Sequence, residues 1–303
     1  MSEEIDFKRI TIIGCGLIGG SIGLSLKKNN YSGQIFGIDK KEVIEKAIDC
    51  QAIDQGSETM ELGIADTDLI ILATPVKEII KLIREIIPCL SRPCLITDTG
   101  STKTDIIRQA EIVLSNKCDF IGGHPMAGSE KSGIEYADPD LFIGKPYIVV
   151  PGNRISPLAN RKMSSIINLI GAVEVQMDAG SHDRVVGLVS HLPQLIAVVM
   201  TNMLGSLVEE QDKKQYFRIS GNVYNEMTRV ACSPFSIWRD IYQTNSKWTI
   251  AFIEELENLL ENIKQKIAEN PDELEVEFTK ANYYKEQMTK WALKNHNKLP
   301  NIK

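Results

Sequence analysis

The hydrophobic pattern of the chain changes near residue 177. Before that point, short runs of β-branched apolar residues alternate with segments of helical periodicity, which is typical of a parallel sheet with crossover helices. We expect an α/β fold with a Rossmann-type, doubly wound and mostly parallel sheet, whose ligands bind at the carboxyl ends of the strands. The predicted strands are 10–13, 34–38, 69–73, 94–98, 120–122, 147–150 and 173–176.

After about Asp178 the alternation of strands stops and longer apolar periodicity begins. The segment 188–207 is almost wholly apolar and predicts a buried helix, and the segment 250–267 places its apolar residues on one stripe. Asn270-Pro271 ends this helix, and a further helix is predicted from about 272 to 294. This half of the chain is therefore predicted to be all-helical.

These patterns divide the chain into a Rossmann-like domain over 1–177 and a helical domain over 178–303. A buried apolar helix in a domain of about 125 residues often needs a second chain to cover it. We therefore expect a homodimer that forms through the helical domain.

Composition narrows the classes of partner. The 303 residues include 34 basic and 40 acidic ones, a net charge of −6, and form no basic block, which argues against nucleic acid or an anionic membrane as partner. The longest apolar stretch, 192–199, contains Pro193 and Gln194 and is too short to span a bilayer. The N-terminal segment is charged and lacks the apolar core of a signal peptide, so none is expected. The six cysteines have irregular spacings, which is typical of reduced thiols. Both features predict a cytoplasmic protein.

A glycine-rich motif, GCGLIG over 14–19, directly follows the first predicted strand. Gly14 permits a tight turn, Gly16 lets the backbone approach a pyrophosphate, and Gly19 lets the next helix pack against the strand. Asp39 ends the second predicted strand and can accept both ribose hydroxyls, whereas its carboxylate would repel a 2′-phosphate. The motif predicts NAD as the cofactor. The expected cofactor-binding residues are Gly14, Gly16, Leu17, Ile18, Gly19, Asp39, Thr74 and Pro75.

Two loops at strand ends carry weaker signals. Thr74 and Pro75 follow an apolar strand, and the proline fixes the backbone so that the loop can lie against the cofactor; a plain turn is the alternative. Ser101 lies in DTGSTK, where its hydroxyl either caps the following helix or meets substrate or nicotinamide.

The segment GGHPMAGSE is the strongest candidate for a catalytic loop. Of the four histidines, His124 is the one at a predicted strand end among glycines. An imidazole that titrates near neutrality suits the removal of a hydroxyl proton as hydride leaves an alcohol carbon; a structural histidine is the alternative. Glu130 can orient a ring, gate access to the site or be a solvated loop acid.

The helical half offers two histidines and one arginine. His182 and His191 lie nine residues apart, so on one regular helix they would face opposite sides and could not share a metal ion. Pro193 disturbs the helix after His191, which makes His191 the candidate for substrate contact and leaves capping or packing to His182. Glu226 precedes Arg229 by three residues on one helical face, and Arg229 leads into an apolar segment, where we expect it to be partly buried and to bind a substrate carboxylate. No cluster of ligands has the spacing of a metal site.

Taken in order, GCGLIGGS, Asp39, ATPV, DTGSTK, GGHPMAGSE, SHLPQ and TRVA, followed by a tryptophan-containing helix, resemble the prephenate dehydrogenase family from about residue 10 to about 245. GGHPMAGSE and SHLPQ are specific, whereas the glycine motif is shared with many oxidoreductases. The resemblance implies oxidative decarboxylation of prephenate to 4-hydroxyphenylpyruvate with NAD, in tyrosine biosynthesis. It also implies a nucleotide-binding domain followed by a helical dimerisation domain.

The resemblance also implies roles for five residues. His124 would be the partner of the substrate's ring hydroxyl, and Ser101 would orient that hydroxyl and the nicotinamide. His191 would contact the substrate, Arg229 would bind a substrate carboxylate, and Glu130 would be a gate near the entrance. The family commonly has aspartate three residues before the arginine, where this chain has glutamate, so the partner of the arginine stays open.

Three alternative functions fit part of the same sequence pattern. Arogenate, which differs from prephenate by an amino group on the side chain, is an alternative substrate. A β-hydroxyacid dehydrogenase would need a helix-borne lysine where this chain has His182, Asp183 and Arg184. A non-catalytic NAD-sensing module would need the glycine motif without the other segments.

Overall fold

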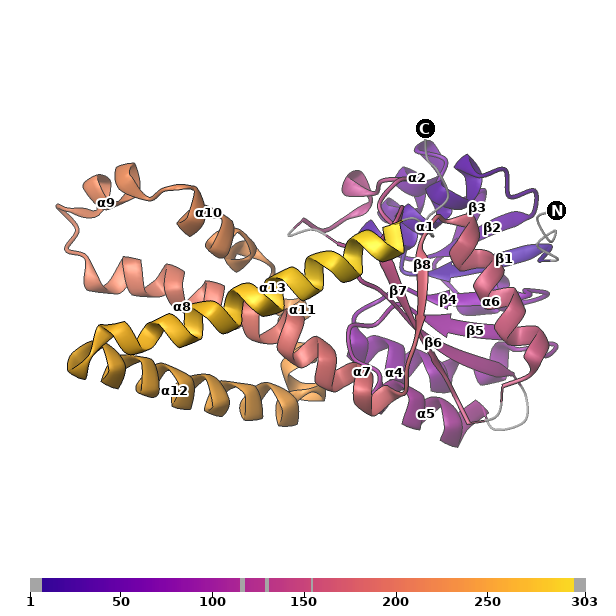
Figure 1. Cartoon of the computed structure of the whole chain (residues 1–303). Helices are drawn as coiled ribbons and strands as arrows, with labels where there is room; N and C mark the ends of the chain where they lie inside the picture. Colours follow the sequence, from indigo (N-terminus) through magenta and orange to yellow (C-terminus); the bar gives the residue numbers. More distant parts are fainter. Residues whose placement is uncertain (1–6, 115–117, 129–130, 154, 297–303) are drawn as a thin grey trace. The chain divides into compact units, whose positions relative to one another are not determined.

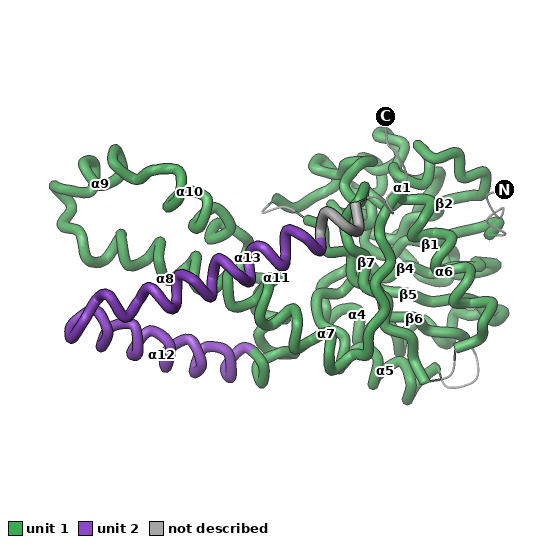
Figure 2. Tube along the Cα trace, in the orientation of Figure 1, with its two compact units in different colours: residues 1–248 green, residues 249–303 purple. Residues whose placement is uncertain are grey.

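The computed structural model describes residues 7–114, 118–128, 131–153 and 155–296, whose elements are labelled in Figure 1. Contacts divide the chain into two compact units, residues 1–248 and 249–303, coloured separately in Figure 2. The first unit contains the sheet, its helices and the helices that follow it up to residue 248. The boundary between the compact units therefore lies further along the chain than the change in hydrophobic pattern near residue 177.

One eight-stranded sheet forms the centre of the first unit, in the order β3-β2-β1-β4-β5-β6-β7-β8. All neighbouring strands pair in parallel except β6 and β7, which are antiparallel. The strand order reverses between β1 and β4, the position where doubly wound folds bind nucleotides. The strands are β1 (Arg9–Ile13), β2 (Gln34–Ile38), β3 (Gln55–Ser57), β4 (Leu69–Leu72), β5 (Leu95–Asp98), β6 (Asp119–Pro125), β7 (Pro146–Pro151) and β8 (Val173–Gln176).

The predicted Rossmann-type sheet is confirmed, and all seven predicted strands are present within a few residues of their expected bounds. The strand that the pattern missed is β3, with the sequence QGS, which lies at the edge of the sheet and contains no apolar residue. This segment is a strand because it pairs with β2, where Gly37 lies opposite Gly56. Hydrophobic periodicity does not predict such a pairing.

Helices cover both faces of the sheet and bury two apolar clusters. On one face, residues of α1, α2 and α6 pack with Ile10 and Ile12 of β1. On the other, residues of α3, α4 and α5 pack with Ile70 and Leu72 of β4. Covering of both faces explains why the central strands are continuous apolar runs. The helices are α1 (Leu17–Lys28), α2 (Lys41–Asp49), α3 (Met60–Ile64), α4 (Val76–Glu85), α5 (Thr104–Leu114) and α6 (Pro157–Leu169), with 3₁₀ turns at Ile87–Cys89 and Ile134–Tyr136.

Helices follow β8 without further strands, as predicted, in the part of the chain that the structure describes. A π-helical turn over Gly187–His191 joins α7 to α8, so the two run as one helix from Ala179 to Leu207. The elements are α7 (Ala179–Val186), α8 (Leu192–Leu207), α9 (Lys213–Ile219), α10 (Asn222–Thr228), α11 (Phe235–Thr244), α12 (Ser246–Glu269) and α13 (Glu275–His296), with 3₁₀ turns at Arg229–Cys232 and Pro271–Leu274.

The expectation that 188–207 is a buried helix is wrong for the single chain. Val199, Met203 and Leu207 are 54%, 51% and 76% exposed, because only the first half of α8 packs into the unit. The joined helix has 29 residues, and by length and composition alone it could cross a membrane. The helix runs through Pro193 and Gln194, as the predicted helix over 188–207 does, and it is longer than the stretch 192–199 that was expected to be too short to span a bilayer.

The second unit is a helical hairpin of α12 and α13. The Asn270 side chain accepts a hydrogen bond from the Asp272 amide and caps the connecting turn, so the predicted stop at Asn270-Pro271 is confirmed. Lys266 and Glu277 join the two helices at 2.8 Å. Apolar residues such as Leu259, Leu260 and Phe278 remain more than half exposed.

Candidate active site

The glycine motif occupies the turn from β1 into α1, at the reversal point of the sheet. Gly14 has φ +95°, and a Cβ there would lie 2.6 Å from the Ala73 carbonyl oxygen, so a side chain is excluded on two grounds. A Cβ at Gly19 would lie 1.9 Å from the Gly14 carbonyl oxygen, which shows how closely the helix packs on the turn. At Gly16 a Cβ would meet nothing within 4 Å. This open space over exposed backbone is where a pyrophosphate would fit.

The first turn of α1 adds hydrogen-bond donors to this space. Leu17 and Ile18 begin the helix, and the Gly20 amide bonds back to the Gly16 carbonyl at 2.8 Å. Amide groups in the first turn of a helix lack intrahelical acceptors and point toward an anion. The acid predicted for the ribose lies beside them, because Asp39 follows β2 and its Oδ2 accepts the Cys15 amide at 2.8 Å.

Thr74 and Pro75 lie between β4 and α4, on the other side of the reversal point. Pro75 is the residue before the first turn of α4, and Thr74 packs its methyl group near the Gly14 turn. The Thr74 hydroxyl is buried and has no hydrogen-bond partner among the described residues. A buried hydroxyl in this state fits a ligand group that completes its hydrogen bonding. The site therefore suits a dinucleotide on both sides of the crevice.

His124 is the sixth residue of β6, and its half-buried ring lies at the carboxyl end of the strand. Its Nδ1 is 2.9 Å from Nε2 of His182, and Nδ1 of His182 is 2.8 Å from Oδ1 of Asp183. His182 is fully buried. We expected this residue to cap or pack, and instead it links the strand-end histidine to a carboxylate on α7.

The Asp183 carboxylate also caps α5. Its Oδ1 accepts the Lys103 amide at 2.7 Å and its Oδ2 accepts the Thr104 amide at 2.9 Å. These first amides of α5 thus donate to a residue 80 positions away rather than to the Ser101 hydroxyl, which was one of its two expected roles. Ser101 lies partly exposed in the loop between β5 and α5.

A buried ion pair lies beneath the same loop. Lys103 and Asp98 are both fully buried, and Nζ of Lys103 donates to Oδ2 of Asp98. Asp98 also accepts the amides of Gly100 at 2.8 Å and Gly123 at 3.2 Å. Loss of either partner would leave an uncompensated buried charge, so the pair ties the loop after β5 to β6.

Electrostatics keep the site imidazoles neutral. Removal from bulk water, together with the electrostatic influence of the neighbouring His182, Lys103 and His191, lowers the pKa of His124 well below its usual value. Burial lowers the pKa of His182, although its hydrogen bond to Asp183 opposes the shift. Burial also lowers the pKa of His191 to about 4. A neutral imidazole at pH 7 is the form that can accept a proton.

His191 reaches the same network from the end of the π-helical turn. Nδ2 of Asn245 donates to the Asp183 carbonyl at 2.7 Å and lies 3.1 Å from Nδ1 of His191. The His191 ring meets Trp238 edge-on, at 6.0 Å between centroids. The expectation that His182 and His191 face opposite sides is wrong, because a π-helical turn rotates less per residue than an α-helix.

Sequence reasoning missed Asp183 and Asn245 as members of the site. The adjacency of His182 and Asp183 was a usable signal, since an acid beside a histidine at the start of a domain can orient its ring. Asn245 carried no signal, because only the fold brings this residue, at the end of α11, to the Asp183 carbonyl 62 positions earlier.

Arg229 begins the 3₁₀ turn that follows α10 and is exposed, not partly buried as expected. The reason is local, since neither α10 nor this turn has a buried residue that could form a core around it. Nε2 of Gln194 donates to the Val230 carbonyl at 2.9 Å and holds the turn against α8. Glu130 lies outside the described residues. The meeting of Arg229 with His124 over one substrate stays a prediction.

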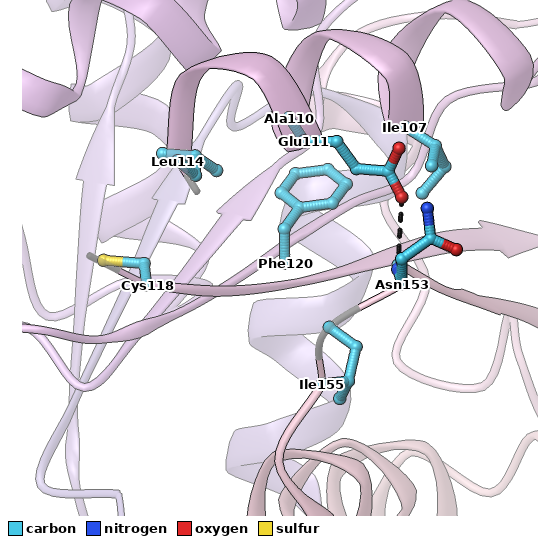
Figure 3. A pocket seen from close by; sticks show the side chains of 9 residues that line it. Ile107, Ala110, Glu111, Leu114, Cys118, Phe120, Asn153 and Ile155 are labelled. Atoms are coloured by element: carbon cyan, nitrogen blue, oxygen red, sulfur yellow. Dashed lines mark hydrogen bonds between the residues drawn. The ribbon is translucent and has the colours of Figure 1, made fainter. Parts of the chain in front are cut away.

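A separate pocket lies near the opposite end of β6, and Figure 3 shows its lining between α5 and the chain after β7. At the edge of this pocket, Oε1 of Glu111 accepts a hydrogen bond from the backbone amide of Asn153 at 3.1 Å. Cys118 and Phe120, at the start of β6, place the pocket away from the strand end that carries His124. Within the described ranges, no group of three or more His, Cys, Asp or Glu could hold a metal ion.

Comparison with known proteins covers both halves of the chain. Residues 22–176 match the family model for the nucleotide-binding domain of prephenate dehydrogenase, and residues 178–281 match the model for its dimerization domain. The prephenate dehydrogenase of Bacillus subtilis (strain 168) is 32% identical over 267 residues, covering 86% of this chain and 71% of that protein. That of Lactococcus lactis subsp. cremoris (strain MG1363) is 34% identical over 262 residues, with the same coverage.

A solved structure is similar over nearly the whole chain. The prephenate dehydrogenase from A. aeolicus, in complex with hydroxyphenyl propionate and NAD+, superposes with a TM-score of 0.86 at 30% identity. The match covers 95% of this chain and all of that one.

Proposed function

Because the chain belongs to the prephenate dehydrogenase family of NAD-dependent oxidoreductases, we propose that it converts prephenate to 4-hydroxyphenylpyruvate in tyrosine biosynthesis. One observation carries the proposal. A neutral imidazole, His124, lies at the carboxyl edge of the sheet, the same edge on which the glycine turn offers its open backbone. This arrangement supplies a base and a dinucleotide site to one crevice.

The residues fit the chemistry of the reaction. NAD, when bound, supplies the acceptor for the hydride that leaves carbon 4 of the substrate ring. His124 takes the proton of the ring hydroxyl, so that the carbon becomes a carbonyl. The ring carboxylate then leaves as carbon dioxide, and its bonding electrons pass through the ring to the carbonyl oxygen. That oxygen takes back the proton held by His124 and becomes the phenol, and aromatisation makes the reaction irreversible. The reaction needs a base, a hydrogen-bond donor that orients the substrate and a cationic side chain that binds the substrate carboxylate, and none of these roles requires a metal ion.

Further roles are proposed from the family and the placement of the residues. Ser101 orients the hydroxyl and the nicotinamide from the loop after β5, and His191 contacts the substrate. Arg229 is exposed and can present its guanidinium to a substrate carboxylate. The proposed role of Glu130 as a gate rests on the family resemblance alone, because this residue lies outside the described ranges. The backbone of residues 14–19 with Thr74 and Pro75 holds the dinucleotide, and Asp39 holds the ribose.

We also propose that the enzyme is a homodimer that forms through the domain over 178–303. The exposed apolar residues of α8 support this assembly, as does the description of the matching family model as a dimerization domain. A second copy is a better cover than lipid, because the same helix carries the buried polar side chains of His182, Asp183 and His191. A cytoplasmic location, without nucleic acid or membrane as partner, is in keeping with the net charge of −6 and with six cysteines that form no disulfide.

The decisive experiment follows the absorbance of NADH at 340 nm with purified protein, NAD and either prephenate or arogenate. We expect turnover with prephenate, release of one carbon dioxide per NADH, and 4-hydroxyphenylpyruvate as product. NADP in place of NAD is the matched control and should support little turnover, because Asp39 would repel its 2′-phosphate. Turnover with arogenate alone would move the assignment to tyrosine formation, and no NADH with either substrate would overturn it.

A further inference from the structure

Three side chains from two distant segments form a continuous hydrogen-bonded row. His124 on β6 contacts His182 on α7 through Nδ1 and Nε2 at 2.9 Å, and the two rings lie 5.1 Å apart at an angle of 59°. His182 contacts Asp183 through its other nitrogen at 2.8 Å. The row therefore begins at a half-buried imidazole and ends at a carboxylate in the protein interior.

The carboxylate at the end of the row is fixed and ionised. Its two oxygens accept the amides of Lys103 and Thr104 in addition to the His182 ring. Burial works to raise the pKa of Asp183, but the hydrogen bonds from His182 and Thr104 and from the amides lower it on balance. The amino end of α5 also favours a negative charge at this point. Asp183 can therefore only accept hydrogen bonds.

This restriction determines each proton along the row. An ionised Asp183 requires His182 to carry its proton on Nδ1, and a neutral ring then has a lone pair on Nε2. That lone pair accepts a hydrogen bond only if His124 carries its own proton on Nδ1. The remaining nitrogen of His124, Nε2, is thereby left with a lone pair.

We propose that His182 and Asp183 are positioning residues that set the tautomer and orientation of His124, so that Nε2 is always ready to accept the substrate proton. The inference rests on the proposed function for its consequence, but the tautomer exists in the protein with or without substrate. When Nε2 takes the hydroxyl proton, the Nδ1 proton stays on His124 and its hydrogen bond to His182 strengthens. The same proton then returns from Nε2 to the phenolate oxygen that forms when carbon dioxide leaves, and the row returns to its first state.

The charged groups around the row favour this arrangement. The groups that face His124 are His182, Lys103 and His191, all of which disfavour a permanent positive charge on it. The groups that face His182 are Asp183, Lys103 and Asp98. Lys103 is paired with Asp98, so Asp183 is the carboxylate that directs the two rings.

The direct test is histidine nitrogen NMR of the full chain labelled with ¹⁵N-histidine, at a pH where the rings are neutral. Single variants of the four histidines assign the signals. We expect both His124 and His182 to carry their protons on Nδ1. In His182→Phe, the constraint is lost and His124 should populate both tautomers. A wild-type His124 with its proton on Nε2 would overturn the proposal, whatever the enzyme turns over.

Kinetics supply the second arm. His182→Phe should lower kcat by about 10- to 100-fold, the usual effect of removing an orienting partner, while KM and the Kd for NAD change little. His182→Gln should recover most of the loss, because its side-chain oxygen can still accept the Nδ1 proton of His124. Equal activity of the Phe and Gln variants would contradict a positioning role. Failure of the wild type on both substrates would instead overturn the proposed function, and the NMR result would still decide the tautomer.

Discussion

Replacement of Gly16 by alanine separates what the glycine turn does for folding from what it does for the cofactor. Gly16 has φ −76°, a value that any residue adopts, and a Cβ there meets nothing within 4 Å. Gly16→Ala should therefore leave the stability of the free protein unchanged. If the pyrophosphate occupies that open space, the methyl group will overpack it at a cost of about 1–3 kcal/mol. The Kd for NAD should then rise about 5- to 150-fold.

The magnitude can be read by thermal denaturation with and without NAD. At a concentration of about 100 Kd, a ligand that binds only the folded protein stabilises it by about 2.7 kcal/mol. A variant that binds tenfold more weakly would be at about 10 Kd under the same conditions, and its stabilisation would fall to about 1.4 kcal/mol. The shift in Tm produced by NAD should therefore shrink by about half, and isothermal titration calorimetry should give the matching Kd.

Gly19→Ala is the matched control, because its Cβ would lie 1.9 Å from a backbone oxygen and 2.9 Å from Cγ2 of Ile12. It should lower the Tm of the free protein by several degrees, as α1 is forced away from β1. A Gly16→Ala protein that binds NAD with wild-type affinity would refute the assignment of that space to the pyrophosphate. A Gly16→Ala protein that melts as early as Gly19→Ala would refute the open geometry itself.

Four further predictions address the base, the carboxylate ligand, the assembly and pH. His124→Asn should lower kcat by about 10²- to 10⁴-fold with little change in KM, and wild-type turnover in this variant would disprove its role as base. Arg229→Ala should mainly raise KM for prephenate. Arg229→Lys should give a KM between those of the wild type and the alanine variant, because lysine keeps the charge but lacks the planar guanidinium. An unchanged KM in Arg229→Ala would exclude contact between this residue and the substrate carboxylate. Val199→Glu should convert the dimer into a monomer of 33.8 kDa, measured by light scattering, because Val199 is 54% exposed in the single chain and belongs to the apolar face proposed for the dimer. A wild-type protein that is already monomeric would contradict the proposed assembly. The free energy of unfolding should fall as the pH drops from about 6.5 toward 4. In this range His191 binds a proton in the unfolded chain but not in the folded protein, where its pKa is lowered to about 4. His191→Gln should reduce this pH dependence, measured by urea titrations at pH 7 and pH 5.

The parts of the fold that could be predicted from the sequence are those encoded by neighbouring residues. The run into Gly14 joins a buried strand, a turn and a helix within a few residues, so its local pattern already contains the geometry that the structure shows. His124 was identifiable because a polar residue after an apolar strand must emerge at the sheet edge. Asp183 was missed because one of its functions, capping α5, depends on residues from a separate part of the chain, and because the ring that it orients, His182, meets His124 only in the fold. No periodicity within one helix records such an arrangement.

Two features of the helical half share one physical cause, the π-helical turn over Gly187–His191. Pro193 lacks an amide proton, and in a regular helix its ring would collide with the carbonyl of Val189, which is why a disturbance of the helix was expected next to His191. Val189 lies inside the π-helical turn, a wider turn that can accommodate the proline ring, and the helix passes through Pro193 to Leu207. The same widening removes part of the rotation between His182 and His191, so both rings join the network of Asp183 and Asn245 instead of pointing apart. The disturbance that Pro193 predicted is therefore present as a π-helical turn, and this turn brings a second histidine to the site.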